Sequence, residues 1–255
     1  MYDLTGKVAV VTGGSQGIGL GASEELARGG AHVVIVDIVK DAAESAVKTL
    51  TQKGFSATYR VCDVSDVPAM NDLFHEVKRT EGSFDILMNN AGVNRRKSSF
   101  DYTPEDWDFI ININLKGTYF STVNAARIMK EQQRGRIINT CSITAFHVEP
   151  VRSIYAVSKG GVLQLTKYLA REYAPLGITV NGIAPGWVRT PLNTVYFNEH
   201  PEEEKAALDA IPMGCPATPT DIGSAARFLA SDEAAHITGH TMVIDCGTLL
   251  GNGAA

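Results

Sequence analysis

Short apolar runs rich in valine and isoleucine recur along the chain and alternate with longer stretches in which apolar and polar residues mix. The runs are apolar at successive positions, which is typical of strands that a parallel sheet buries on both faces. They predict seven strands, at residues 7–12, 32–37, 57–61, 84–89, 136–142, 178–183 and 241–245. The amphipathic stretches predict helices at residues 19–29, 41–53, 67–80, 104–133 and 153–174.

The ends of the predicted helices carry capping signals. Thr103, Pro104 and Glu105 place a hydroxyl, a proline and an acid at the start of one helix. Glycine, which favours the left-handed end of a helix, follows other helices at Gly54, Gly82, Gly135 and Gly177. Repeated β–α–β units of this kind predict a doubly wound α/β fold, with a parallel sheet and helices on both faces. Since no linker or repeat interrupts them, we expect a single domain over residues 1–255.

One segment departs from this alternation. Residues 185–219 contain six prolines, two glycines and an acidic run at Glu202, Glu203 and Glu204. A connection of this length is uncommon inside a compact domain unless it is functional or poorly ordered. Two interpretations stay open, a substrate lid at about residues 187–215 and a variable surface loop.

The composition narrows the class of protein. Of the 255 residues, 44% are hydrophobic and 20% are charged, as in an ordinary soluble globular protein. The net charge of −5 is spread along the chain without a basic patch, which argues against a nucleic-acid partner. The apolar runs fall well short of the ~18 residues that a membrane-spanning helix needs.

The cysteines and histidines show no metal or disulfide pattern. The four cysteines lie far apart without a CxxC pair, so we expect buried free thiols in a reducing compartment. None of the six histidines has ligand spacing with another, and no metal site is predicted. The N-terminus lacks the layout of a signal peptide, and the expected location is therefore cytoplasmic.

A glycine-rich turn joins the first predicted strand to the first predicted helix. Within residues 12–19, Gly13, Gly17 and Gly19 have a GxxxGxG spacing. Glycines let backbone N–H groups approach a pyrophosphate, and the helix N-terminus adds partial positive charge. The cluster alone is compatible with a simple turn, but its place between strand and helix favours a dinucleotide site.

Asp37 ends the second predicted strand, where a dinucleotide fold carries its ribose-binding carboxylate. A carboxylate there accepts hydrogen bonds from the adenosine ribose and repels a 2′-phosphate. Ser15 and Gln16 in the turn are neutral, and Lys40 lies three residues beyond Asp37. The sequence therefore favours NAD over NADP, the alternative being an aspartate that only caps the next helix.

Together these features resemble the short-chain dehydrogenase/reductase family. The chain has the glycine turn, Asn89-Asn90-Ala91-Gly92, Ser142, and Tyr155 with Lys159 in the order that this family shows. The match covers about residues 5–248, and the joint occurrence of the motifs is far more specific than any one of them. The resemblance implies a Rossmann-type fold with a seven-stranded parallel sheet, and an enzyme that interconverts alcohols and ketones.

Tyr155 and Lys159 are four residues apart, so on a helix they lie one above the other. A phenol with a pKa of about 10 is a poor base at neutral pH, but a neighbouring ammonium and a positive nicotinamide lower that pKa. The resemblance makes Tyr155 the general acid/base, and has Lys159 lower its pKa and contact the nicotinamide ribose. It assigns Ser142 to the substrate oxygen and Asn114 to a water-mediated proton relay.

The resemblance also implies cofactor contacts at the carboxyl ends of several strands. Asp63 and Val64 match the pair that holds the adenine ring. The positions of the turn, of the fourth strand end and of the sixth strand end that match cofactor contacts are Ser15, Gln16, Ile18, Asn90, Ala91, Gly92, Pro185, Gly186, Val188 and Thr190.

Arg95 and Arg96, followed by Lys97, stand at the rim of the expected site. Arginine binds carboxylates in a bidentate geometry. A similar arginine pair occurs in family members that act on sugar acids such as gluconate. The alternative to a carboxylate-binding site is a solvated basic turn at the subunit surface.

Other polar positions bear on the substrate class. His147 and Arg152 precede Tyr155, and their polarity suits a polyol-like substrate better than a fatty one. Trp187 and residues 192–197 are expected to form the apolar underside of a mobile lid over the nicotinamide.

The sequence thus predicts an NAD-dependent oxidoreductase that interconverts a secondary alcohol and a ketone, on a sugar acid, polyol or similar polar molecule. One alternative is a 3-oxoacyl-carrier-protein reductase that uses NADPH. Another is a catalytically silent sensor or scaffold, although such relatives generally lose the tyrosine or the lysine. The family usually forms tetramers through its long central helices, so a homotetramer is expected.

Overall fold

The sheet has the strand order β3-β2-β1-β4-β5-β6-β7, and all neighbouring strands are parallel. The structure is a computed structural model that describes residues 2–251, apart from the side chains at positions 192, 193 and 195. It confirms the predicted seven-stranded doubly wound sheet. The strands are β1 (Val8–Thr12), β2 (His32–Asp37), β3 (Ala57–Val61), β4 (Ile86–Asn89), β5 (Gly135–Thr140), β6 (Ile178–Pro185) and β7 (Thr241–Ile244).

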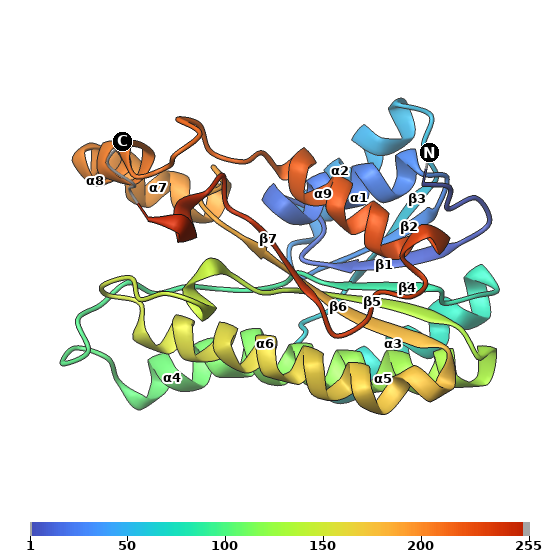
Figure 1. Cartoon of the computed structure of the whole chain (residues 1–255). Helices are drawn as coiled ribbons and strands as arrows, with labels where there is room; N and C mark the ends of the chain where they lie inside the picture. Colours follow the sequence, from blue (N-terminus) through green and yellow to red (C-terminus); the bar gives the residue numbers. More distant parts are fainter. Residues whose placement is uncertain (1, 252–255) are drawn as a thin grey trace.

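Helices cover both faces of the sheet (Figure 1). One face packs against α1 (Gly17–Arg28), α2 (Lys40–Gln52) and α9 (Pro219–Ala230), which share an apolar core with it. The other packs against α3 (Val67–Glu81), α5 (Thr118–Gln132) and α6 (Ser153–Tyr173). The strands β1, β4, β5 and β6 are buried along their whole length because helices lie on both faces, which explains their apolar runs.

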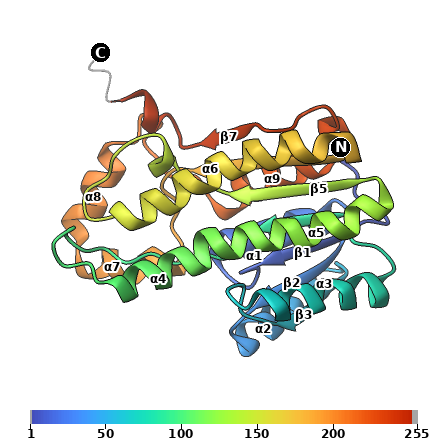
Figure 2. The same cartoon turned by 90° about the horizontal axis from the view of Figure 1, so that it is seen from below.

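The predicted helix 104–133 is interrupted. It divides into α4 (Pro104–Ile111), a π-helical turn at Asn112–Gly117, and α5. Figure 2 shows α4 and α5 still following one another as almost one rod. A π-helical turn often marks a functional position, and this one contains Asn114.

Most of the predicted helix ends are correct. Thr103 and Asp106 form a reciprocal capping box at α4, and Gly54, Gly82 and Gly177 have positive φ angles. The expectation for Gly135 is wrong, because Gln133 takes the left-handed conformation at the end of α5 and Gly135 begins β5. A glycine is needed there for space, since a Cβ on it would lie 2.3 Å from the Met129 Sδ.

The proline-rich segment is more regular than either interpretation of it assumed. It contains two helices, α7 (Pro191–Glu199) and α8 (Pro201–Asp209), which lie together at one end of the molecule (Figure 1). The sequence also missed α9, whose start is capped reciprocally by Thr218 and Asp221. Three prolines therefore begin helices, at positions where the missing N–H costs nothing.

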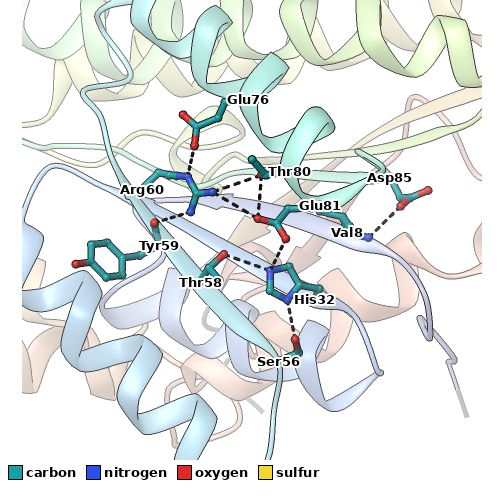
Figure 3. A network of polar contacts seen from close by, with 10 residues as sticks. All are labelled: Val8, His32, Ser56, Thr58, Tyr59, Arg60, Glu76, Thr80, Glu81 and Asp85. Atoms are coloured by element: carbon teal, nitrogen blue, oxygen red, sulfur yellow. Dashed lines mark hydrogen bonds and ion pairs between the residues drawn. The ribbon is translucent and has the colours of Figure 1, made fainter.

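A polar network joins α3 to the β2–β3 edge of the sheet (Figure 3). The ring nitrogens of His32 lie 2.7 Å from the Ser56 Oγ and 3.2 Å from the Thr58 Oγ1. Glu81, at the end of α3, lies against both His32 and Arg60. Because β3 is the edge strand, it pairs with β2 on one side only. The network adds side-chain contacts from α3 to this edge.

The cysteine expectation is corrected in part. All four cysteines are free, but only Cys141 is buried, and Cys215 is exposed. Within residues 2–251, no helix combines the length and apolarity that crossing a bilayer requires. The same part of the chain holds no cluster of three or more His, Cys, Asp or Glu residues suited to a metal ion.

Candidate active site

A cavity of about 390 Å³ opens at the carboxyl ends of β1 and β4, where the strand order reverses direction. In open α/β sheets this switch point is where ligands bind. Residues from the glycine turn, from the end of β4, from β5 and α6, and from the start of α7 line the cavity: Gly13, Gln16, Gly17, Ile18, Asn90, Ala91, Gly92, Thr140, Tyr155, Lys159, Thr190 and Pro191.

The glycine turn is built for close backbone packing. Gly13 and Gly17 have φ angles of 60° and 51°, which favour glycine. A Cβ on Gly19 would lie 2.0 Å from the Gly13 carbonyl oxygen. The Asn90 Nδ2 donates to that same oxygen at 3.0 Å, which ties the turn to the end of β4.

Thr12 completes the connection between the two strands. Its Oγ1 accepts hydrogen bonds from the Asn90 and Ala91 backbone N–H groups at 3.0 and 3.2 Å. The result is a cradle with exposed glycine backbone at the N-terminus of α1, which fits the pyrophosphate of a dinucleotide.

Asp37 lies beside this cradle. Its Oδ2 accepts hydrogen bonds from the Ser15 hydroxyl at 2.5 Å and from the Ser15 N–H at 3.3 Å. The alternative role as a helix cap has little support, because α2 begins at Lys40 after Val39 and has no side-chain cap. The Asp37 Oδ1 accepts only the local Val39 N–H, at 3.1 Å. A carboxylate next to the phosphate cradle suits ribose hydroxyls.

Two polar side chains of α6, Tyr155 and Lys159, line the far side of the cavity. Ser142 lies two residues beyond the end of β5 and is not among the lining residues. The Ser142 hydroxyl hydrogen-bonds the Tyr155 phenol. The Lys159 Nζ lies 5.8 Å from the centre of the Tyr155 ring and donates to the Thr140 carbonyl at 2.7 Å.

Burial dominates the protonation of this group. It raises the pKa of Tyr155 to about 12, which the Ser142 hydrogen bond offsets only in part. It also lowers the pKa of Lys159 to about 8. The expected lowering of the Tyr155 pKa is therefore not seen in this structure. Burial destabilises the phenolate more than the hydrogen bond from Ser142 stabilises it.

Asn114 does not line the cavity but contacts the segments that do. Its Nδ2 donates to the Val93 carbonyl at 2.9 Å and its Oδ1 accepts the Val93 N–H at 2.8 Å. The same Nδ2 lies 3.1 Å from the Ser158 Oγ, which donates to the Tyr155 carbonyl at 2.7 Å. Asn114 thus joins the segment after β4 to the helix that carries Tyr155.

The eighteen expected cofactor residues divide into two sets. Ten of them line the cavity, whereas eight are not among its lining residues: Ser15, Gly19, Asp37, Asp63, Val64, Pro185, Gly186 and Val188. Thr140 and Pro191 line it and were missed. Thr140 was open to prediction, since it is two residues before Ser142 and alternate residues share one side of a strand.

The rim cations are already paired. Arg95 and Lys97 both contact Asp106, whose side chain is only 2% exposed, and Arg95 lies 4.2 Å over the Phe109 ring. Hydrogen bonds from Lys97 and Arg95 hold the pKa of Asp106 well below its usual range. These two cations are therefore anchored to the start of α4.

Arg96 points to a different element. Its guanidinium lies 4.0 Å from the centre of the Tyr196 ring and 5.0 Å from that of Phe197, both on α7. Phe197 in turn packs against Trp187, with ring centres 5.6 Å apart. Leu192 and Val195, also assigned to the underside of a lid, have side chains outside the described part of the structure.

His147 and Arg152 both contact Glu149. They line a second cavity, of about 410 Å³, together with Thr144 and Lys97 among others. This cavity shares no lining residue with the one at Tyr155. The structure therefore does not bring His147 and Arg152 to the wall of the first cavity.

Comparison with known proteins supplies a family context. A family model described as enoyl-(acyl carrier protein) reductase matches residues 13–248. The chain is 41% identical over 256 residues to the oxidoreductase UcpA of Salmonella typhimurium, covering 98% of this chain and 97% of that protein. It is 35% identical to the 3-oxoacyl-acyl-carrier-protein reductase FabG of Thermotoga maritima, covering 97% of this chain and 99% of that protein.

The fold also matches solved structures. A gluconate 5-dehydrogenase from Burkholderia cenocepacia, in complex with NADP and tartrate, superposes with a TM-score of 0.92. Its sequence is 33% identical, and the match covers 97% of each chain.

Proposed function

The chain belongs to the short-chain dehydrogenase/reductase family, whose members are oxidoreductases acting on CH–OH groups, and we propose that it is an NAD-dependent dehydrogenase of a sugar acid or polyol. It interconverts a secondary alcohol and a ketone. The observation that carries this proposal is that Tyr155 and Lys159 line the same cavity as the glycine turn, with Ser142 hydrogen-bonded to Tyr155.

The roles of these side chains follow from their chemistry. The Tyr155 oxygen accepts the proton of the substrate hydroxyl in oxidation and returns it in reduction. The Ser142 hydroxyl, already hydrogen-bonded to that phenol, orients the substrate oxygen toward it. The Lys159 ammonium favours the phenolate by its charge. A bound NAD supplies the hydride acceptor for oxidation, or as NADH the donor for reduction.

Asp37 supports the choice of NAD. Its carboxylate is held beside the phosphate cradle by two hydrogen bonds from Ser15. A 2′-phosphate near this carboxylate would meet like charge, whereas ribose hydroxyls would find an acceptor.

Arg96 supports an acidic or polyhydroxylated substrate. It lines neither cavity itself, but it contacts α7, whose first residue Pro191 lines the cavity at Tyr155, and its side chain is only 15% exposed. A nearly buried guanidinium is a strong binding partner for a carboxylate. The similarity to a gluconate 5-dehydrogenase points to the same substrate class. His147 and Arg152 remain candidates only for the distal end of a longer substrate.

We extend the proposal to the whole molecule. Residues 1–255 act as one domain, in which the 187–215 segment with α7 and α8 closes over the substrate. The exposed aromatic side chains of α4, α5 and α6, among them Trp107, Tyr119 and Tyr168, support assembly into a homotetramer through these helices. The location consistent with free cysteines is the cytoplasm.

The second candidate is an NADPH-dependent 3-oxoacyl-acyl-carrier-protein reductase. The identity to FabG favours it, and the complex of the gluconate 5-dehydrogenase shows NADP in a relative. The charged rim and the Asp37 carboxylate weigh against it.

One assay separates the two candidates. D-Gluconate and D-glucitol are offered with NAD or NADP, and a 3-oxoacyl thioester with NADH or NADPH. We expect oxidation of D-gluconate with a kcat/KM for NAD at least about tenfold above that for NADP, which corresponds to 1.4 kcal/mol. A preference for NADPH together with turnover of the thioester alone would refute the proposal.

A further inference from the structure

Arg96 pairs with an exposed carboxylate, whereas its sequence neighbours Arg95 and Lys97 pair with a buried one. Arg95 and Lys97 pair with the buried Asp106 within their own part of the fold. Arg96 instead lies 3.8 Å from the Glu203 Oε2 on α8. The arginine side chain is 15% exposed and the glutamate side chain 53%, so a nearly buried cation has its partner at the surface.

Aromatic contacts hold this pair in place. The Arg96 guanidinium stacks on Tyr196, whose hydroxyl donates to the same Glu203 Oε2 at 2.7 Å. The His200 ring lies parallel to Tyr196, with centres 4.2 Å apart. Tyr196 therefore touches both ions and positions the Glu203 carboxylate over the arginine.

A second carboxylate near Arg96 has other partners. Burial raises the pKa of Glu149, and the nearby charges of His147 and Arg96 offset this rise only in part. Glu149 pairs with Arg152 and with His147, at 3.3 Å in the latter case. Glu203 is thus the more exposed and the more weakly held of the two anions at Arg96.

A nearly buried guanidinium needs an anion beside it, since an unpaired charge there loses its hydration without compensation. The carboxylate of a sugar acid has the same chemistry as that of Glu203. Either can satisfy Arg96, and Glu203, whose side chain is 53% exposed, can turn into solvent by giving up its hydrogen bond from Tyr196.

We propose that Glu203 is a specificity-determining residue, whose carboxylate holds the place at Arg96 that the carboxylate of an acidic substrate takes during binding. A sugar acid displaces Glu203 and leaves Arg96 paired. A neutral polyol leaves the Arg96–Glu203 pair intact and binds without that contact. The inference rests on the proposed function in taking a sugar acid as the substrate.

The central variant is Glu203→Gln, which keeps size and hydrogen bonding but removes the competing charge. We expect the KM for D-gluconate to fall by about threefold, the scale of a partly exposed ion pair, with the KM for D-glucitol unchanged. Glu202→Gln is the matched control, because Glu202 is the exposed neighbour on the same first turn of α8. It should alter neither constant.

A binding measurement makes the outcome independent of turnover. The chain has two tryptophans, so Trp107→Phe leaves Trp187, which packs against Phe197, as the sole reporter. Fluorescence titrations with D-gluconate and D-glucitol, in the presence of NAD, then give dissociation constants. Glu203→Gln in this background should tighten the binding of D-gluconate by the same factor and leave that of D-glucitol unchanged.

A double-mutant cycle assigns the effect to the pair. Arg96→Ala should weaken D-gluconate binding about tenfold, as loss of a charge-assisted contact does, and should cancel the gain from Glu203→Gln. Arg95→Ala is its control, and it should not change the ratio of the two dissociation constants.

The outcomes separate this inference from the proposed function. If D-gluconate is not oxidised but binds more tightly to Glu203→Gln, the proposed function fails and the inference holds. If D-gluconate is oxidised but Glu203→Gln changes both probes equally, or weakens D-gluconate binding, the inference is overturned. Absence of D-gluconate binding to both forms overturns it as well.

Discussion

The dinucleotide side of the site, at Lys159, and the substrate side, at Arg95, Lys97 and Arg152, differ in how their cations are paired. On the dinucleotide side, Lys159 is a buried ammonium whose direct hydrogen bond is to a carbonyl oxygen, that of Thr140. On the substrate side, Arg95, Lys97 and Arg152 each contact a carboxylate. The pKa of Lys159 falls to about 8 through burial, while the paired cations carry compensated charges.

The two sides therefore differ in whether their cations are paired with a carboxylate before a ligand binds. The dinucleotide side buries Lys159 next to Tyr155, the residue that we propose exchanges a proton, and this burial lowers the pKa of the lysine. On the substrate side each of these cations already has a carboxylate partner, so an acidic ligand has to replace an existing ion pair. Pre-paired charges of this kind contribute selectivity more than affinity.

The largest effect is expected where the two sides meet. Tyr155→Phe removes the proton-transferring oxygen and keeps the ring, so kcat should fall by about 10²- to 10⁴-fold. NAD affinity should stay within about twofold, since the cradle is made by the glycine turn. Steady-state kinetics and a fluorescence titration with NADH measure the two quantities. Retained turnover would exclude Tyr155 as the acid/base.

The uncompensated charge of Lys159 predicts a pH-dependent stability. Its folded-state pKa of about 8 lies below the ordinary value of 10.5, so between these pH values the unfolded chain binds a proton that the folded protein does not. The free energy of unfolding of the wild type therefore rises with pH across this window. Lys159→Met lacks this term, which amounts to about 3 kcal/mol at most.

We therefore expect Lys159→Met to gain most in stability over the wild type below pH 8, and the difference to shrink as the pH rises to 10.5. Urea unfolding at several pH values measures it. Lys167→Met, an exposed lysine on the same helix, is the control for other alkaline effects. A difference that does not change with pH would show that Lys159 is not desolvated.

The glycine turn is expected to give a smaller but distinct effect. Gly19→Ala places a Cβ against the Gly13 carbonyl and the Asn90 amide. The clash should cost about 1–3 kcal/mol, seen as an NAD dissociation constant raised about tenfold or more. Gly160→Ala is the matched helical control, since a Cβ there meets nothing within 4 Å. Equal NAD affinities in the two variants would disprove a cradle made by close backbone packing.

The Glu203 exchange is the smallest of the expected effects, and it tests the substrate side alone. Removing the Glu203 charge from the substrate side should improve the binding of an acidic substrate. Removing the Lys159 charge from the dinucleotide side should impair catalysis.

The agreement between sequence and structure was best where local chemistry suffices. The boundaries of β2 and β3 match the predicted residues. For β2 the reason is a continuous apolar run that the sheet buries. Tyr155 and Lys159 share one side of α6, because helical spacing alone places them there. The missed helix α9 and the helices α7 and α8 lie in proline-rich sequence, where capping prolines resemble breakers.

The charged residues of the rim were the hardest to interpret. Arg95, Arg96 and Lys97 look equivalent along the chain, yet two contact Asp106 and one contacts α7 and α8. Nothing in their local sequence distinguishes them, because each partner comes from a different part of the fold. The same holds for His147 and Arg152, which tertiary packing places at a separate cavity.

The amino-acid sequence by itself determined the sheet, the glycine turn before α1 and the shared helix side of Tyr155 and Lys159, since these depend on periodicity, on glycine and on residues one helical turn apart. Only the tertiary structure decided which cation is anchored, which can meet a ligand, and how far burial moves each pKa. The reason is physical. Electrostatic energies depend on distance and on exclusion of water, and both are set by segments that are remote in sequence.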